Sequence, residues 1–247
     1  MSVEITFKSE SDVELIQSMG CDSIIAKAAR VSTRGQTADT IPESEVSGLL
    51  RYLMQHRHGT PFEAGAMTFF IRAPIFVWRE FHRHRIGFSF NEESARYKTL
   101  DPVFYLPRSD RPMMKVDGWK PGRPKFTESP KLVHAQLCEN LRTSYLCGYN
   151  NYLNNLQMGI DPGLARDCLP VGIYSSCWVT CNPRSLMHFL SLRTHRPLSL
   201  RTHRPDAQKV SYPLWEIEQV ANQLEARFAE LFPITHSAFN DFGRTAP

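Results

Sequence analysis

The segment from Arg79 to Tyr97 passes from a helical to an extended pattern, and cationic side chains gather where the pattern changes. The helix begins at Ala73-Pro74 and ends around residues 85–87. The segment is rich in arginine, histidine and aromatic residues: Arg79, Arg83, Arg85, Arg96, His82, His84, Phe81, Phe88, Phe90 and Tyr97. Arginine presents a planar fork that suits phosphate oxygens. The segment therefore indicates either a bound anion or a structural cluster of ion pairs, with Arg79 and Arg83 on one helix face.

Size and charge are those of a globular protein. The chain has 247 residues, of which 42% are apolar and 22% charged, so it can bury a real core. We predict a single domain over residues 1–247. The net charge of +4 is mild for a nucleic-acid-binding protein, and the arginines are confined to a few places. This distribution fits a small anionic ligand better, and we predict no nucleic-acid partner.

Neither a membrane segment nor a disulfide framework is predicted. No apolar run approaches the roughly 20 residues of a membrane helix, and the acidic N-terminus lacks the apolar core of a signal peptide. The six cysteines form no C-x-x-C pair: Cys21, Cys138, Cys147, Cys168, Cys177 and Cys181. We expect them to be reduced and buried in a cytoplasmic protein. Cys177, Cys181 and His188 match no common zinc spacing, so no metal site is predicted.

Hydrophobic periodicity predicts helices and strands along the chain. Strands are expected at residues 3–7, 67–72, 104–106 and 171–181, and helices at 12–20, 24–31, 40–58, 73–85, 131–157, 161–169, 182–197 and 213–232. Thr40 and Asn182 are the predicted N-caps of two helices. The helix at 131–157 is expected to bury Val133, Leu137, Leu141, Tyr145, Tyr152 and Leu156. Residues 32–39 are expected to form a polar loop, and the tail after residue 232 to be loosely held.

Two stretches interrupt this pattern. The proline-rich insert at about 107–130 is too long for an ordinary loop, and loops of this length are usually functional or mobile. The tandem octapeptide at 190–205 contains LSLRTHRP twice, letter for letter. Two copies this short cannot stack a core, which favours a local duplication over a solenoid repeat. Pro197 is expected to end the preceding helix, because proline has no N–H to donate.

Four motifs resemble those of one enzyme family. Arg83–Tyr97 contains R-H-R and then S-x-N-E-x-S-x-R-Y, and His58–Glu63 reads H-x-T-P-F-E. Ala165–Pro170 reads A-R-x-x-L-P, and Asn182–Arg193 reads N-x-R-S-L-x-x-F-L-x-L-R. Together they resemble the flavin-dependent thymidylate synthases (the ThyX family). The chain has one extra residue between R-H-R and the second serine, and we place it beside Gly87, where glycine can accept a bulge.

The resemblance implies a fold and a reaction. The fold would be α/β (α+β type), with a central mixed sheet flanked by helices, assembled as a homotetramer whose active sites use more than one subunit. The reaction would make dTMP from dUMP, with methylenetetrahydrofolate as carbon donor, FAD as hydride carrier and NADPH as reductant of the flavin. A flavin hydride removes the need for a cysteine nucleophile, and no cysteine lies in the arginine-rich segment.

The resemblance also assigns roles to residues. The catalytic residues would be Arg193 and His58, with Arg193 favouring the ionised pyrimidine N3. Flavin binding would fall to Thr60, Arg83, His84, Arg85, Glu92, Asn182, Pro183, Arg184 and His188. Substrate binding would fall to Glu80, Arg83, Glu92, Glu93, Ser94, Ala95, Arg96, Arg166 and Arg193. Glu80 stands where the family often has glutamine. We expect His84 to be a neutral imidazole, because it lies among cations.

Two other classes of function stay open at this point. The aromatic residues and arginines of 79–96 would also suit a module that stacks bases and contacts a nucleic-acid backbone. A flavoprotein oxidoreductase that acts on another nucleotide would use the same cofactor set. Steep salt dependence of oligonucleotide binding distinguishes the first class, and product analysis the second.

Overall fold

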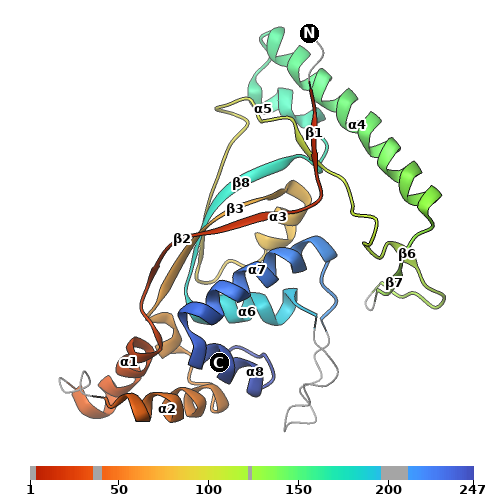
Figure 1. Ribbon diagram of the computed structural model, residues 1–247. Coiled ribbons are helices and arrows are strands. Elements are labelled where there is room, and N and C mark those ends of the chain that lie inside the picture. The colour runs from red at the N-terminus through yellow and green to blue at the C-terminus, as the bar shows by residue number, and fades with distance from the viewer. Residues whose placement is uncertain (1–3, 36–40, 122–123, 196–210) are drawn as a thin grey trace. The chain divides into compact units, whose positions relative to one another are not determined.

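A computed structural model describes residues 4–35, 41–121, 124–195 and 211–247 of the chain (Figure 1). It contains both helices and strands, so the predicted mixed α/β class is confirmed. The chain divides into two compact units, each assembled from several segments. The first unit consists of Met1–Asp12, Arg72–His82 and Glu92–Cys177, and the second of Val13–Ile71, Arg83–Asn91 and Trp178–Pro247.

The principal sheet has four strands in the order β2-β3-β8-β4. Their bounds are Asp12–Met19, Ala66–Pro74, Tyr174–Cys181 and Phe88–Glu92. The inner strand β3 buries most of its residues, including Met67, Phe69 and Ile71, as expected for a strand covered on both faces. Two short pairs complete the strands: β1 (Thr6–Lys8) runs parallel to β5 (Val103–Tyr105), and β6 (Met114–Lys115) pairs antiparallel with β7 (Phe126–Thr127) inside the proline-rich insert.

The predicted helix at 12–20 is wrong, because this segment is strand β2. Val13 and Leu15 are half-buried, whereas Asp12, Glu14 and Ile16 are exposed. This alternation has the period of a strand with one covered face. β2 lies at the end of the strand order, and its pairing with β3 outweighs the helical spacing of its apolar residues.

The first unit packs around the long helix α4, which spans Lys131–Gln157 as predicted. Its second half supplies Tyr145, Tyr149 and Tyr152 to a buried cluster. In this cluster the Tyr145 ring stacks on the Phe104 ring, with centroids 4.7 Å apart. The first half does not bury the predicted residues: Val133 and Leu137 are exposed. Three short helices, α3 (Ile75–Phe81), α5 (Pro162–Ala165) and the 3-10 turn η3 (Arg166–Cys168), belong to the same unit.

The second unit is mainly helical. Its helices are α1 (Asp22–Arg34), α2 (Glu43–Gln55), the 3-10 turn η2 (Thr60–Glu63), α6 (Pro183–Arg193), α7 (Trp215–Leu231) and α8 (Pro233–Asp241). Helix α1 runs to Arg34, so the loop predicted from residue 32 begins later. The N-cap of α2 is Pro42, and the predicted cap Thr40 lies outside the described residues.

The C-terminal segment is held in place, contrary to the predicted loose tail. Thr235 and Phe239 of α8 are fully buried. The carboxylate of Asp22 accepts hydrogen bonds from the backbone N–H groups of Ile234 and Thr235, at 2.8 and 3.0 Å, and from the Thr235 hydroxyl at 2.6 Å. Asp22, although far away in sequence, thus accepts hydrogen bonds from N–H groups in the first turn of α8, which have no acceptor within the helix.

The cysteines are free thiols, as predicted, but they are not all buried. Cys177 and Cys181 are buried, and burial raises the pKa of Cys181 to about 12. Cys21 and Cys147 are exposed. Within the described ranges, every helix is too short or too polar to cross a bilayer.

Candidate functional site

A cavity of about 940 Å³ lies within the second unit, between the start of α6 and the segment 83–88. Its lining consists of Glu63, Arg83, His84, Arg85, Ile86, Gly87, Phe88, Asn182, Arg184, Ser185, His188 and Leu192. Six of these residues were predicted as flavin ligands: Arg83, His84, Arg85, Asn182, Arg184 and His188. The two motifs that carry them are almost 100 residues apart, so only the folded chain brings them together.

The segment 83–88 enters the cavity as an irregular stretch followed by a turn. Helix α3 ends at Phe81, so Arg83 lies beyond it, and the expectation that it shares a helix face with Arg79 is wrong. The backbone N–H of Phe88 bonds the carbonyl of Arg85 at 3.3 Å and closes the turn. Gly87 adopts a left-handed φ of 68°, which glycine tolerates without steric cost. The structure thus has a tight turn at Gly87, and the placement of the extra residue there stays a prediction.

Gly87 also permits a close approach to α6. A Cβ atom at this position would lie 2.1 Å from Ser185 Oγ and 2.9 Å from Asn182 Nδ2. Asn182 is the N-cap of α6, as predicted, and its Oδ1 accepts a hydrogen bond of 2.8 Å from the Ser185 N–H. The turn thus contacts the positive end of the helix dipole, which favours anions.

Arg184 and His188 lie one helical turn apart on α6 and both line the cavity, so the predicted shared polar face is confirmed. The Arg184 guanidinium is fixed from two sides. Its Nη1 lies 2.6 Å from Glu63 Oε1, and its Nε donates to the carbonyl of Pro247 at 2.8 Å. It also packs on Gly59, where an added Cβ would lie 2.4 Å from its Cζ. Sequence reasoning missed Glu63 and Gly59, although both lie in or beside the H-x-T-P-F-E motif.

A hydrogen bond joins His84, which lines the cavity, to Arg193, the last residue of α6. Arg193 Nε donates to His84 Nε2 at 3.0 Å, so this nitrogen carries no proton. Burial, and then the charges of Arg193, His188 and Arg83, lower the pKa of His84 to about 4. The expected neutral imidazole is therefore confirmed. The His84 ring also meets Phe189 edge-on, with centroids 4.9 Å apart.

Apolar groups complete the wall. The Phe88 ring stacks on the Phe90 ring, with centroids 5.9 Å apart, and lies tilted beside the Phe189 ring, with centroids 6.2 Å apart. Ile86 and Leu192 add aliphatic surface. Arginines, whose guanidinium groups suit phosphate oxygens, and a helix N-terminus thus occur beside an apolar surface that suits a ring system. The volume is near the upper end of the roughly 300–1,000 Å³ typical of small-molecule sites. The donor set and the size fit a dinucleotide with an aromatic ring.

Besides Arg193, three predicted residues of the second unit lie outside the cavity lining. His58 and Thr60 are exposed, with Thr60 at the start of η2. The His58 ring meets Tyr52 edge-on, with centroids 6.0 Å apart. Pro183 is buried in the first turn of α6. Their predicted roles stay predictions.

The remaining predicted ligands belong to the first unit: Glu80, Glu92, Glu93, Ser94, Ala95, Arg96 and Arg166. The two adjacent glutamates are held by strand β8, because Glu92 Oε1 accepts from the Ser175 hydroxyl at 2.6 Å and Glu93 Oε1 from the Ser176 N–H at 2.7 Å. A turn follows, closed by hydrogen bonds from the N–H groups of Tyr97 and Lys98 to the Ser94 carbonyl.

Within this turn the side chains differ in exposure. Ala95 is buried in the first unit's core, whereas Arg96 is exposed. Arg166, at the start of η3, is also exposed. The Arg96 guanidinium lies over the Tyr97 ring, 5.4 Å from its centroid. The turn therefore presents a cation and backbone groups on a rigid base.

Fold and site together define a class: an α/β protein with a cavity whose arginines, helix N-terminus and aromatic wall are suited to a large phosphorylated ligand with an aromatic ring. Comparison with known proteins is specific. Residues 14–234 match the family described as "Thymidylate synthase complementing protein". The "Flavin-dependent thymidylate synthase" of Streptomyces coelicolor is 46% identical over 99% of this chain and 96% of its own, and that of Streptomyces avermitilis is 46% identical over 98% and 96%.

A solved structure agrees with the sequence relatives. The UMP/dUMP methylase PolB from Streptomyces cacaoi, bound with 5-Br dUMP, superimposes with a TM-score of 0.87 and 45% identity, covering 98% of this chain and 100% of that one. The chain therefore belongs to the thymidylate synthase complementing protein family, which includes the flavin-dependent thymidylate synthases.

Proposed function

We propose that this chain is a flavin-dependent thymidylate synthase that makes dTMP from dUMP. Methylenetetrahydrofolate supplies the carbon, FAD carries the hydride and NADPH reduces the flavin. The observation that carries the proposal is the cavity of the second unit, where two separate family motifs supply arginines, a helix N-terminus and a neutral histidine. Identity of 46% over nearly the whole length of named relatives supports the same reaction.

In this proposal the cavity holds FAD. Arg83, Arg85 and Arg184 would bind its phosphates, because each offers a charged fork and Arg184 is already oriented by Glu63. Asn182 and His188 add polar contacts, and Phe88 supplies apolar surface. Bound flavin supplies the hydride of the reaction. The protein's own residues bind and orient the flavin and the nucleotide and polarise the nucleotide.

Arg193 is the proposed catalytic cation. A guanidinium beside the pyrimidine N3 lowers the pKa of that nitrogen and so favours the anionic ring, which is more electron-rich. The neutral His84 accepts from Arg193 Nε and restricts the plane of the guanidinium without competing for its charge. Glu80, Glu92, Glu93, Ser94, Ala95, Arg96 and Arg166 are proposed to bind dUMP, and His58 and Thr60 to lie near the flavin.

We further propose a homotetramer with shared active sites, acting on small molecules in the cytoplasm. Large exposed apolar residues on α4 support an assembly interface, because Leu132 is 82% exposed and Val133 and Leu146 are more than 40% exposed. Free thiols support a reducing compartment. Light scattering coupled to gel filtration tests the assembly: a monomer at micromolar concentration would contradict it.

The reaction is tested with purified protein, FAD, NADPH and methylenetetrahydrofolate. Parallel reactions receive dUMP or UMP, because the solved relative is named for both substrates. Chromatography should show dTMP formed from dUMP. Methylation of UMP alone would contradict the substrate assignment. Flavin reduction without methylation of either nucleotide would indicate another oxidoreductase, and salt-sensitive oligonucleotide binding without flavin a nucleic-acid-binding module.

A further inference from the structure

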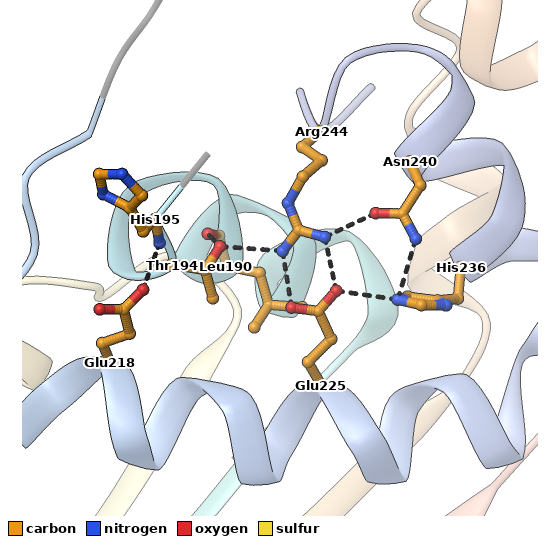
Figure 2. A network of polar contacts seen from close by, with 8 residues as sticks. All are labelled: Leu190, Thr194, His195, Glu218, Glu225, His236, Asn240 and Arg244. Carbon is orange, nitrogen blue, oxygen red and sulfur yellow. Dashed lines mark hydrogen bonds and ion pairs between the residues drawn. The ribbon is translucent and has the colours of Figure 1, made fainter. Parts of the chain in front are cut away.

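A buried polar network lies outside the cavity, on helices α7 and α8 and the segment after α8 (Figure 2). The guanidinium of Arg244 meets the Glu225 carboxylate in a bidentate pair, with Nη1–Oε1 at 2.5 Å and Nη2–Oε2 at 2.6 Å. His236 Nε2 lies 2.9 Å from Glu225 Oε1, and Asn240 Oδ1 accepts from Arg244 Nη1 at 2.6 Å. The carboxylate is thus held by two partners.

This network is built for rigidity. Arg244 is only 7% exposed and adopts a left-handed φ of 51°, a conformation that a non-glycine residue keeps only when its surroundings fix it. Burial alone would raise the pKa of Glu225, but the hydrogen bonds from His236 and Arg244 outweigh it and lower the pKa to about 2. The pair is therefore charged throughout the physiological range.

The network ends on the residue that follows Arg193. Arg244 Nη2 donates to Thr194 Oγ1 at 2.9 Å, and this hydroxyl donates to the Leu190 carbonyl at 2.7 Å (Figure 2). Thr194 is the C-cap of α6 and is 4% exposed. A hydroxyl that bridges Arg244 to the last turn of the helix fixes where the helix stops.

His195, which follows Thr194, is held by helix α7. The backbone N–H of His195 donates to Glu218 Oε1 at 2.5 Å. Glu218 and Glu225 lie seven residues apart on α7, which places both carboxylates on one face of that helix. Two carboxylates of α7 therefore hold the two residues that directly follow Arg193, one directly and one through Arg244 (Figure 2).

We infer that Glu225 and Arg244 are positioning residues for Arg193: through Thr194 they fix the last turn of α6, so that Arg193 Nε meets His84 Nε2. Neither side chain lines the cavity. The consequence for catalysis rests on the proposed function, whereas the mechanical link to His84 does not. A displacement of about 1 Å at a catalytic group can lower a rate on the order of a hundredfold.

Two variants test the link, with a third as matched control. Glu225→Gln removes the charge that holds Arg244, and Thr194→Val removes the bridging hydroxyl with little change of shape. Glu230→Gln makes the same chemical change on the same helix, in an exposed ion pair with Arg227. Each is assayed for dTMP formation and for thermal unfolding. Glu225→Gln and Thr194→Val should lower kcat roughly tenfold or more, and Glu230→Gln should leave it unchanged.

The decisive readout is the titration of His84, which a scaffold role alone would not change. Proteins labelled with ¹³C at histidine Cε1 give few signals, because the chain has nine histidines. The His84 signal is identified by its absence from His84→Gln. Arg193, His188 and Arg83 face this ring. Wild-type His84 should stay neutral down to about pH 5, whereas loss of the Arg193 contact should raise its pKa toward the usual value of about 6.5.

An unchanged His84 titration in folded Thr194→Val and in folded Glu225→Gln would overturn the inference, and so would an equal shift in Glu230→Gln. If Glu225→Gln does not fold, Thr194→Val decides alone. If wild-type protein forms no dTMP, the proposed reaction fails, but the His84 titration still decides whether the network positions Arg193.

Discussion

The close approach of Gly87 to α6 can be tested by one methyl group. An added Cβ would lie 2.1 Å from Ser185 Oγ and 3.1 Å from Ser185 Cβ, in a residue whose φ is 68°. Gly35 is a matched control. Its φ is also positive, at 55°, but no atom of the residues that the structure describes lies within 4 Å of its added Cβ. Both alanine variants therefore carry strain from a positive φ, and only Gly87→Ala adds the steric contact.

The expected magnitudes follow from these two terms. A left-handed alanine costs about 1–2 kcal/mol, and the stiffer unfolded chain offsets about 0.4–1 kcal/mol of this. Gly35→Ala should thus lower the free energy of unfolding by about 1 kcal/mol. Gly87→Ala adds overpacking of roughly 1–3 kcal/mol, because Ser185 or the turn must move, for a total of about 2–4 kcal/mol.

Urea unfolding followed by circular dichroism measures both variants. Gly87→Ala combined with Ser185→Ala removes the nearest atom, so the double variant should recover about 1 kcal/mol relative to the sum of the single changes. Equal losses for Gly87→Ala and Gly35→Ala, together with strict additivity of the Ser185 change, would refute the close approach.

Three further predictions concern the site. Arg193→Ala should abolish dTMP formation and Arg201→Ala should retain most of it, because α6 reaches Arg193 unbroken whereas Arg201 belongs to the second octapeptide copy, outside the described residues; the reverse pattern in a product assay would contradict this. Deleting residues 198–205 should preserve activity, because one copy remains in the same register; an inactive, folded deletion variant would refute it. Since the His84 pKa of about 4 lies below the usual 6.5, the unfolded chain takes up a proton that the folded chain does not, and stability should fall as the pH drops from about 6.5 toward 4. At about pH 5 the loss is roughly 2 kcal/mol before solvent screening and about 1 kcal/mol after it, and urea unfolding of His84→Gln should lack this component; an equal acid loss would refute the assignment.

Local spacing was enough to predict much of this protein. The α4 bounds, the Asn182 cap of α6 and the shared face of Arg184 and His188 depend on residues within a turn of one another, and the structure has all three. The neutral His84 was also expected from the arginines beside it in sequence, although burial is the larger cause of its lowered pKa. Such features are visible in sequence because backbone geometry fixes which nearby residues meet.

Tertiary structure decided what lies between distant segments. Strand β2 forms where local spacing indicated a helix, since the sheet pairs it. The partner of Arg184 is Glu63, 121 residues away, and Arg244 reaches back 50 residues to Thr194. No periodicity encodes these pairs, because a charged side chain on a helix face shows neither which surface will cover it nor which opposite charge that surface carries. Packing brings the partners together, and for Arg244 and Thr194, which are buried, the loss of water makes the pairing obligatory.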